Sequence, residues 1–338
     1  TSLSDKNGVA LFESWISYDF NTNWTAKFGR QVLSYDNQRI MGGIDWLQQG
    51  QSHDAVLVTN KKNGYQLDFG AALNNNNEAL YESAYVTNYK NMQFIWFNQK
   101  FSKFSLSFLA LNNGYQYENL VENKFQVAYL QTIGTFGKWD ASKFYGDFGL
   151  YAQTGEAAIT NDKVAVGAYY AGFNLGYKFT NPFKAELGFE YLSGKDQNDT
   201  DTKVKSFTPL FGTNHGFNGL MDYFYVGNHK NSVGLQDFYT KFIYDKNKWQ
   251  VTFAPHVFYS AASVYNMATL EEQDSYLGTE IDLTATYKMD KNLVISGGVS
   301  KMFASDTMEI LKGGNNSNGN NWAWVMVSFN PQLFTHKK

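Results

Sequence analysis

The segment FKAELGFEY, residues 183–191, alternates between apolar and polar or small side chains. A strand places successive side chains on opposite faces, so this segment predicts a strand with one apolar and one polar face. The apolar face holds Phe183, Ala185, Leu187, Phe189 and Tyr191, and the other face holds Lys184, Glu186, Gly188 and Glu190. In a soluble sandwich the apolar face would be the core, whereas in an outer-membrane barrel it would contact lipid. The period alone does not separate these two folds.

The same alternation recurs from end to end, and helical periodicity is scarce. Residues 277–288 repeat the scheme, with Leu277, Ile281 and Leu283 opposite Glu280 and Asp282. We count about 15 strands, many of them roughly 9–12 residues long, which suits a tilted strand that spans a bilayer. Aromatic side chains also gather near the strand ends, as expected at a membrane interface.

The connections between these strands alternate between short and long. Short turns are expected near residues 21–23, 61–64, 102–103, 137–143, 180–182, 245–248 and 289–292. Longer links are expected near residues 33–53, 74–91, 112–124, 154–163, 193–235, 261–276 and 304–321. This asymmetry predicts an all-β protein, a transmembrane antiparallel β-barrel with short periplasmic turns and long extracellular loops. A large soluble sandwich or a propeller is the alternative, although we find no repeated blade motif.

The strand count and direction predict one domain over residues 1–338 whose amino-terminal strand or strands are missing. The last strand, residues 322–329, should end on the short-turn side, and an odd count then leaves the first strand starting on the long-loop side. An even-numbered barrel would therefore need one or three further strands, for a total of about 16 or 18.

Composition narrows the function classes. The chain has 338 residues, no cysteine and a formal charge of −3, so it has no disulfide and no field that attracts nucleic acid. The five histidines show no pair at metal-ligand spacing, and no G-x-S-x-G elbow occurs. We expect no enzyme activity, no cofactor and no metal site. Outer-membrane lipid, a hydrophilic saccharide or other small solute, and other envelope proteins are the expected partners.

Arg30 and Arg39 are the only two arginines, and both lie at or near the loop that follows the strand from Trp24. Guanidinium groups suit carboxylates and phosphates, so the pair either orients a solute or ties this loop to nearby carboxylates. Simple alternation would put Arg30 on the lipid side beside Phe28. Because Gly29 can form a bulge, we expect Arg30 to point into the barrel or to lie above the membrane.

Charged residues on the inward faces are the other pore-lining or solute-orienting candidates. They are Lys184, Glu186, Glu190, Asp237, Lys241, Glu280, Asp282 and Lys288, together with Arg30 and Arg39. The long loop of residues 193–235 has an apolar second half, which should fold over or into the pore as a constriction. The candidates in it are Phe207, His215, Phe217 and Asp222.

Two loop motifs resemble the alginate-export porin family: GRQVLSYDNQRIMGGIDWLQQGQSHDAVLV, residues 29–58, and FTPLFGTNHGFNGLMDYF, residues 207–224, followed by GLQDFYTKFIY. The resemblance implies an outer-membrane barrel of about 18 strands whose pore lining, rich in arginine and lysine, passes an anionic polysaccharide. With two arginines this chain is an atypical member, and we do not expect alginate itself to be its solute. The sequence predicts a porin-like channel for passive passage of a hydrophilic solute or oligosaccharide. The alternative is a plugged barrel that scaffolds a larger envelope complex.

Overall fold

The computed structural model describes residues 11–44, 50–74, 88–229, 232–332 and 334. Its main feature is one sheet of 15 antiparallel strands in the order β1 to β12, β15, β16 and β17. The first strands are β1 (Ser14–Asp19), β2 (Trp24–Gln31), β3 (His53–Lys62), β4 (Tyr65–Leu73), β5 (Asn91–Phe101), β6 (Phe104–Asn119), β7 (Lys124–Ala141) and β8 (Phe144–Ala158). The others are β9 (Lys163–Lys178), β10 (Phe183–Leu192), β11 (Leu235–Lys246), β12 (Trp249–Tyr259), β15 (Tyr276–Lys288), β16 (Leu293–Ala304) and β17 (Asn320–Phe329).

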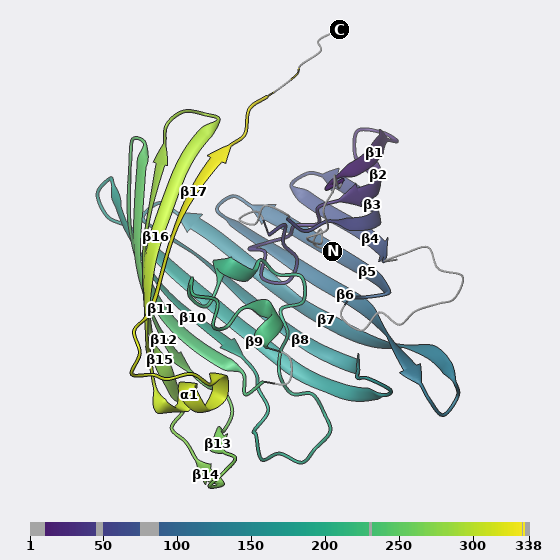
Figure 1. Ribbon diagram of the computed structural model, residues 1–338. Helices are drawn as coiled ribbons and strands as arrows, with labels where there is room; N and C mark the ends of the chain where they lie inside the picture. The colour runs from purple at the N-terminus through teal and green to yellow at the C-terminus, as the bar shows by residue number, and fades with distance from the viewer. Residues whose placement is uncertain (1–10, 45–49, 75–87, 230–231, 333, 335–338) are drawn as a thin grey trace.

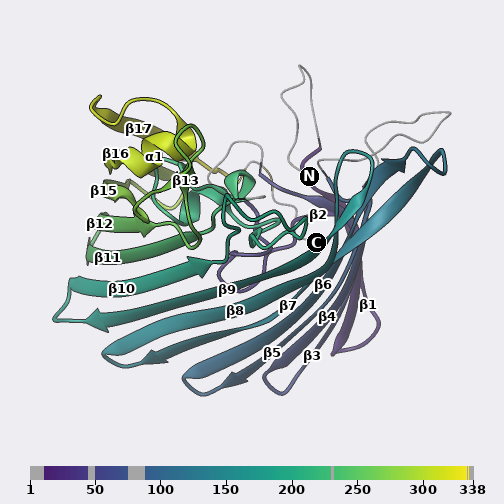
Figure 2. The same cartoon turned by 90° about the horizontal axis from the view of Figure 1, so that it is seen from below.

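The sheet curls into a wall with a concave inner face, and β1 and β17 lie at its two ends (Figures 1 and 2). Neighbouring strands in this sheet are antiparallel, and their order in space is the order in which they occur along the chain. The predicted all-β class and the predicted number of strands in this chain are therefore confirmed. The part of the chain that the structure describes does not close the wall, because β1 and β17 are not paired with each other.

Strands β6, β7 and β8 are longer than the sequence pattern predicted. The expected link of residues 112–124 shrinks to residues 120–123, because β6 and β7 continue as a paired hairpin. The expected turn of residues 137–143 shrinks to residues 142–143 for the same reason. The extension of β6, residues 112–119, is rich in Asn and Tyr, and the strict apolar alternation on which the prediction relied fades there.

The outer, convex face is apolar, as the alternation predicted. Ile16, Phe28 and Leu187 are each more than 60% exposed, whereas Glu190 on the opposite face is 5% exposed. The prediction for Leu277 was wrong: the alternation places its side chain on the outer face, but the structure buries it. The pairing of β12 with β15 shifts between Phe258 and Tyr259, and Gly278 has φ +147°, so this bulge turns Leu277 inward.

Small elements lie in the longer connections. They are the hairpin of β13 (Tyr265–Asn266) and β14 (Glu271–Glu272), the 3-10 turns η1 (Asn214–Gly216) and η2 (Val226–Asn228), and helix α1 (Asp306–Lys312). Helix α1 lies in the link of residues 304–321, where the strand pattern predicted only a loop. Ser305 caps it by accepting a hydrogen bond from the Met308 amide, and Gly313 ends it with φ +73°. Within the described residues, no helix is long and apolar enough to span a membrane.

Candidate functional site

Two connections cover the concave face of the sheet and meet there (Figures 1 and 2). The first, residues 32–44, is here called the arginine loop, and the second, residues 206–225, the aromatic loop. Their backbones pair directly: the Gly42 amide donates to Phe211 O at 2.9 Å, and the Phe211 amide donates to Ile40 O at 3.0 Å. A Cβ on Gly212 would lie 2.3 Å from Arg39 O, so only glycine permits this approach. The two loops therefore form one unit.

Apolar burial anchors this unit to the wall. Ile40, Met41 and Phe207 are each at most 3% exposed and belong to one buried cluster with the inner side chains of the strands. The Phe207 ring stacks on Tyr170 of β9, with 5.5 Å between ring centroids. Since each such side chain removes much apolar area from water, burial contributes roughly 1.5–3 kcal/mol per residue. The aromatic loop thus behaves as a packed segment of the interior.

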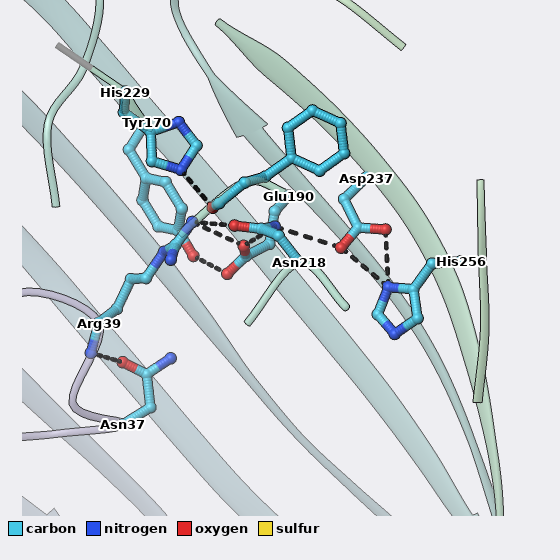
Figure 3. Close-up of polar contacts among 9 residues, drawn as sticks. Asn37, Arg39, Tyr170, Glu190, Asn218, His229, Asp237 and His256 are labelled. Carbon is cyan, nitrogen blue, oxygen red and sulfur yellow. Dashed lines mark hydrogen bonds and ion pairs between the residues drawn. The ribbon is translucent and has the colours of Figure 1, made fainter. Parts of the chain in front are cut away.

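A buried ion pair lies at the centre of the unit. Arg39 is 2% exposed, and its Nη2 is 2.9 Å from Oε2 of Glu190 on β10. The same Nη2 donates to Oδ1 of Asn218 at 2.8 Å, and the guanidinium lies 4.6 Å from the Phe217 ring centroid. Tyr170 Oη donates to the second Glu190 oxygen at 2.6 Å. The charge of Arg39 is therefore balanced by a carboxylate that is itself fully hydrogen-bonded (Figure 3).

Asn218 extends this network from β10 to β12. Its Nδ2 donates to Glu190 Oε2 at 2.8 Å and to Asp237 Oδ2 at 3.2 Å. Asp237 in turn contacts Nδ1 of His256 at 2.9 Å (Figure 3). Asn218 and Gly219 have φ of 59° and 83°, a left-handed pair typical of a tight Asn-Gly turn. This turn points the Asn218 side chain into the wall.

Two carboxylates of β15 receive the next residues of the aromatic loop. The Met221 amide donates to Glu280 Oε1 at 2.9 Å, and the Leu220 amide donates to Asp282 Oδ2 at 3.3 Å. A Cβ on Gly219 would lie 2.6 Å from the Glu280 carboxyl carbon. These contacts fix the height of the loop on the wall.

The arginine loop has a second polar anchor at Asp36. Its carboxylate accepts hydrogen bonds from Ser107 Oγ at 2.6 Å and from Trp96 Nε1 at 3.2 Å. Burial raises the pKa of the Asp36 carboxyl, and these hydrogen bonds act in the opposite direction. Beside it, Tyr35 Oη donates to Asp68 Oδ2 at 2.9 Å.

Cavities lie on two sides of the loop unit. One of about 720 Å³ lies at the long-loop ends of the strands, and Lys195, Asp199, His229 and Lys312 are among its lining residues. Another of about 370 Å³ is here called the Lys241 cavity. Its polar lining includes Glu186, Lys241, Thr252, His256, Asp282 and Thr284, and residues 216–220 of the aromatic loop cover it.

The structure brings together many of the candidates that the sequence selected, though not all. The loop unit and its wall contacts contain Arg39, Glu190, Asp237, Glu280, Asp282, Phe207 and Phe217. Glu186 and Lys241 lie beside each other in the Lys241 cavity, as register partners on β10 and β11.

The remaining candidates lie apart from this assembly. Lys184 is 3.7 Å from Asp245 near the short turn after β11, and Lys288 is exposed at the end of β15. His215 Nδ1 lies 3.1 Å from Asp222 Oδ2, and the His215 ring packs edge-on against Trp322 of β17. These four residues have no part in the hydrogen bonds described above for Arg39, Glu190 and Asn218.

We predicted that Arg30 either points into the barrel or lies above the membrane, and the structure contradicts the first alternative. Pairing continues through Gly29 without a register shift, so Arg30 stays on the outer row with Phe28, and Gln31 turns inward with 0% exposure. It does not point into the barrel. Asp54 lies directly opposite on β3 and accepts from Nε and Nη2 at 2.8 Å each. This two-bond pair lets a guanidinium remain on the outer face. Whether it lies above the membrane stays a prediction.

Sequence reasoning missed Asn218, Tyr170 and His256. The Asn-Gly dipeptide at 218–219 is a strong turn signal that was available in the sequence. His256 lies on the inward face of β12 with Ala254 and Phe258. The prediction considered only the spacing between histidines and did not use this alternation. Among the described residues, no group of three or more His, Cys, Asp or Glu is placed to hold a metal ion.

Solved structures with a similar fold are outer-membrane porins. OccAB1 of Acinetobacter baumannii has a TM-score of 0.60 at 13% identity, covering 92% of this chain and 75% of that one. OccK10 (OpdN) of Pseudomonas aeruginosa has a TM-score of 0.59 at 10% identity, covering 94% and 83%. The outer membrane protein opdK of the same organism has a TM-score of 0.57 at 12% identity, covering 91% and 77%.

These likenesses concern the fold, which is that of porins. A comparison with curated proteins finds no similar sequence. The family model described as Alginate export matches residues 1–321, nearly the whole chain, so the chain belongs to the Alginate export family.

Proposed function

We propose that the protein is an outer-membrane channel for passive passage of a hydrophilic solute, with the loop unit as its constriction. The observation that carries this proposal is the polar seam Arg39–Glu190–Asn218–Asp237–His256, which holds two loops across the concave face. Cavities with charged side chains in their linings lie next to the two loops. A barrel wall with an apolar outside and a polar inside, narrowed by a packed loop, is the architecture of a selective pore.

The charge balance argues against a polyanion such as alginate as the solute. Arg39 is neutralised by Glu190, and Arg30 is neutralised by Asp54 on the outer face. Neither arginine is left to bind a chain of carboxylates. We therefore propose a small solute or a neutral oligosaccharide.

The membrane orientation follows the loop lengths. We propose that the short turns lie in the periplasm and that the long connections, with α1 and β13–β14, lie outside the cell. We also propose that further strands join the free edges of β1 and β17, because an open edge in lipid leaves backbone groups without partners.

Single-channel recording in planar bilayers tests the channel. We expect steady current from the native protein and a larger unit conductance from a variant in which residues 208–222 are replaced by a short Gly-Ser linker. A shortened β13–β14 hairpin is the matched control and should keep the native conductance. Equal conductance in the native and linker forms would contradict the constriction.

A plugged barrel that serves as a scaffold is the second candidate function. The dense apolar docking of Ile40, Met41 and Phe207 against the wall favours it, because a filled interior carries no current. Silence of the native protein in bilayers, together with current from the linker variant, would support the plug.

A further inference from the structure

The Lys241 cavity has the size of a small-molecule site. Its volume of about 370 Å³ lies within the usual range for ligand pockets. Strands β10, β11, β12 and β15 supply its walls, and the Asn218-Gly219 turn supplies its cover. Because four strands and a packed loop define it, the site is built into the fold.

His256 lines this cavity and uses one of its two ring nitrogens within the described structure. The side chain is 7% exposed, and its Nδ1 is held 2.9 Å from Asp237 Oδ1. No described residue lies within hydrogen-bond distance of Nε2, which Figure 3 shows turned away from Asp237. Because carboxylate oxygens accept hydrogen bonds, Nδ1 donates to Asp237, and Nε2 is the ring nitrogen that remains for a ligand.

The other polar groups of the cavity are mainly acceptors as well. Glu186 uses Oε1 to accept from Tyr145 Oη at 2.8 Å, and Asp282 accepts from the Leu220 amide and from Ser300 Oγ. Thr252 and Thr284 add hydroxyl groups to the lining. Lys241, whose Nζ lies 5.0 Å from the Tyr239 ring centroid, is the cation of the lining. Two carboxylates and the His256 ring therefore line the cavity together with one ammonium group.

We propose that this cavity is a subsite for a solute that carries a primary ammonium or guanidinium group. Such a group supplies several N–H donors and a positive charge, which match Glu186, Asp282 and Nε2 of His256. Lys241 opposes the solute and keeps its affinity low enough for release, as conduction requires. The proposal rests on the proposed channel function and names the class of its solute.

Binding of putrescine to the full-length protein in detergent micelles is the first test, measured by isothermal titration calorimetry. Two compounds of the same chain length serve as probes of chemistry: 1,4-butanediol is neutral, and succinate is anionic. We expect putrescine to bind at least about tenfold more tightly than either, since charge-assisted hydrogen bonds add that much. Equal binding of butanediol, tighter binding of succinate, or no binding of putrescine would overturn the proposal.

Substitutions of the lining residues test whether putrescine binds in the Lys241 cavity. Glu186→Gln and Asp282→Asn should each weaken putrescine binding about tenfold. Lys241→Gln should strengthen it, a gain that a misfolded protein cannot produce. Asp290→Asn, on the short turn after β15, is the matched control and should bind as the native protein does. Unchanged affinity in both carboxylate variants would overturn the site assignment.

Reversal potentials in a KCl gradient separate this proposal from the channel function. Cation preference that falls in Asp282→Asn and rises in Lys241→Gln supports both. A silent protein that still binds putrescine would remove the channel function and leave the subsite standing. A conducting protein with anion preference and no putrescine binding would remove the subsite alone.

Discussion

Nη2 of Arg39 lies 2.9 Å from Oε2 of Glu190, and both side chains are at least 94% buried. The first residue lies in a loop near the start of the chain and the second lies in the tenth strand. This pair, together with the hydrogen bonds that Asn218 makes to both residues, holds the loop unit against the wall.

Arg39→Met should destabilise the protein strongly. Removing the guanidinium leaves Glu190 buried without its counter-charge, at a cost of about 3–5 kcal/mol. The double variant Arg39→Met with Glu190→Leu should recover much of that loss, because it removes both charges. Urea unfolding followed by tryptophan fluorescence in detergent measures the change.

Arg30→Met is the control for this prediction, because the Arg30–Asp54 pair is 38% and 50% exposed. Its cost should stay within about 1 kcal/mol. An equal loss of unfolding free energy in Arg39→Met and Arg30→Met would show that the buried pair contributes no more to stability than the exposed pair.

Gly219→Ala should displace the aromatic loop. The new Cβ would meet the Glu280 carboxyl at 2.6 Å in a backbone with φ +83°. Gly314→Ala shares the strain of positive φ, at +97°, but has nothing within 4 Å of its Cβ. The difference between the two variants isolates the steric clash, for which we expect about 1–3 kcal/mol. Limited proteolysis of the loop checks the result, and equal cleavage of both variants would contradict it.

Asn218→Asp should break the hydrogen bonds from this position to Glu190 and Asp237. The amide donates to Glu190 and Asp237, and a carboxylate there would put a third negative charge among them. We expect a loss of at least about 2 kcal/mol at neutral pH, larger than that of Asn218→Ala. Asn315→Asp, at an exposed position after α1, keeps its acceptor for the Ser317 amide and should be neutral. The same unfolding assay compares the three variants.

The His229 site should make stability depend on pH. The ring is buried and donates to Phe224 O at 2.8 Å, and burial lowers its pKa to about 3. The unfolded chain has a histidine pKa near about 6.5, so below that pH it binds a proton that the folded state does not bind. Stability is therefore lost as the pH falls from about 6.5 towards 3, by up to about 1.4 kcal/mol per pH unit.

His229→Gln keeps a donor for Phe224 O and removes the titration. Between pH 7.5 and 5.5, its unfolding free energy should fall less than that of the native protein. Parallel pH curves would show that His229 does not contribute.

The fold was largely predictable because alternation is a local property of each strand. Phe183, Leu187 and Glu190 revealed their faces by position alone. Leu277 did not, because the bulge at Gly278 depends on the register with β12. Helix α1 carried its own signals, Ser305 before it and Gly313 after it, which the strand pattern around them obscured.

The site was predictable in its parts and not in its assembly. The charges on β10, β11 and β15 were identified from their parity, and Arg39 from its rarity. That Asn218 would join Glu190 to Asp237 depends on how a loop crosses the wall, and no local periodicity encodes that path. Likewise, the outward position of Arg30 depends on Asp54, whose place opposite it follows from strand register.

The wide sequence separation of the residues in the polar seam sets an order of assembly. Arg39 precedes β10, the aromatic loop and β12 along the chain by well over a hundred residues, so we expect the seam to form only when those strands are side by side. Contacts between such remote segments form slowly, because a long stretch of chain must first be ordered. We therefore expect the strands of the wall to pair before the arginine loop and the aromatic loop dock across the concave face.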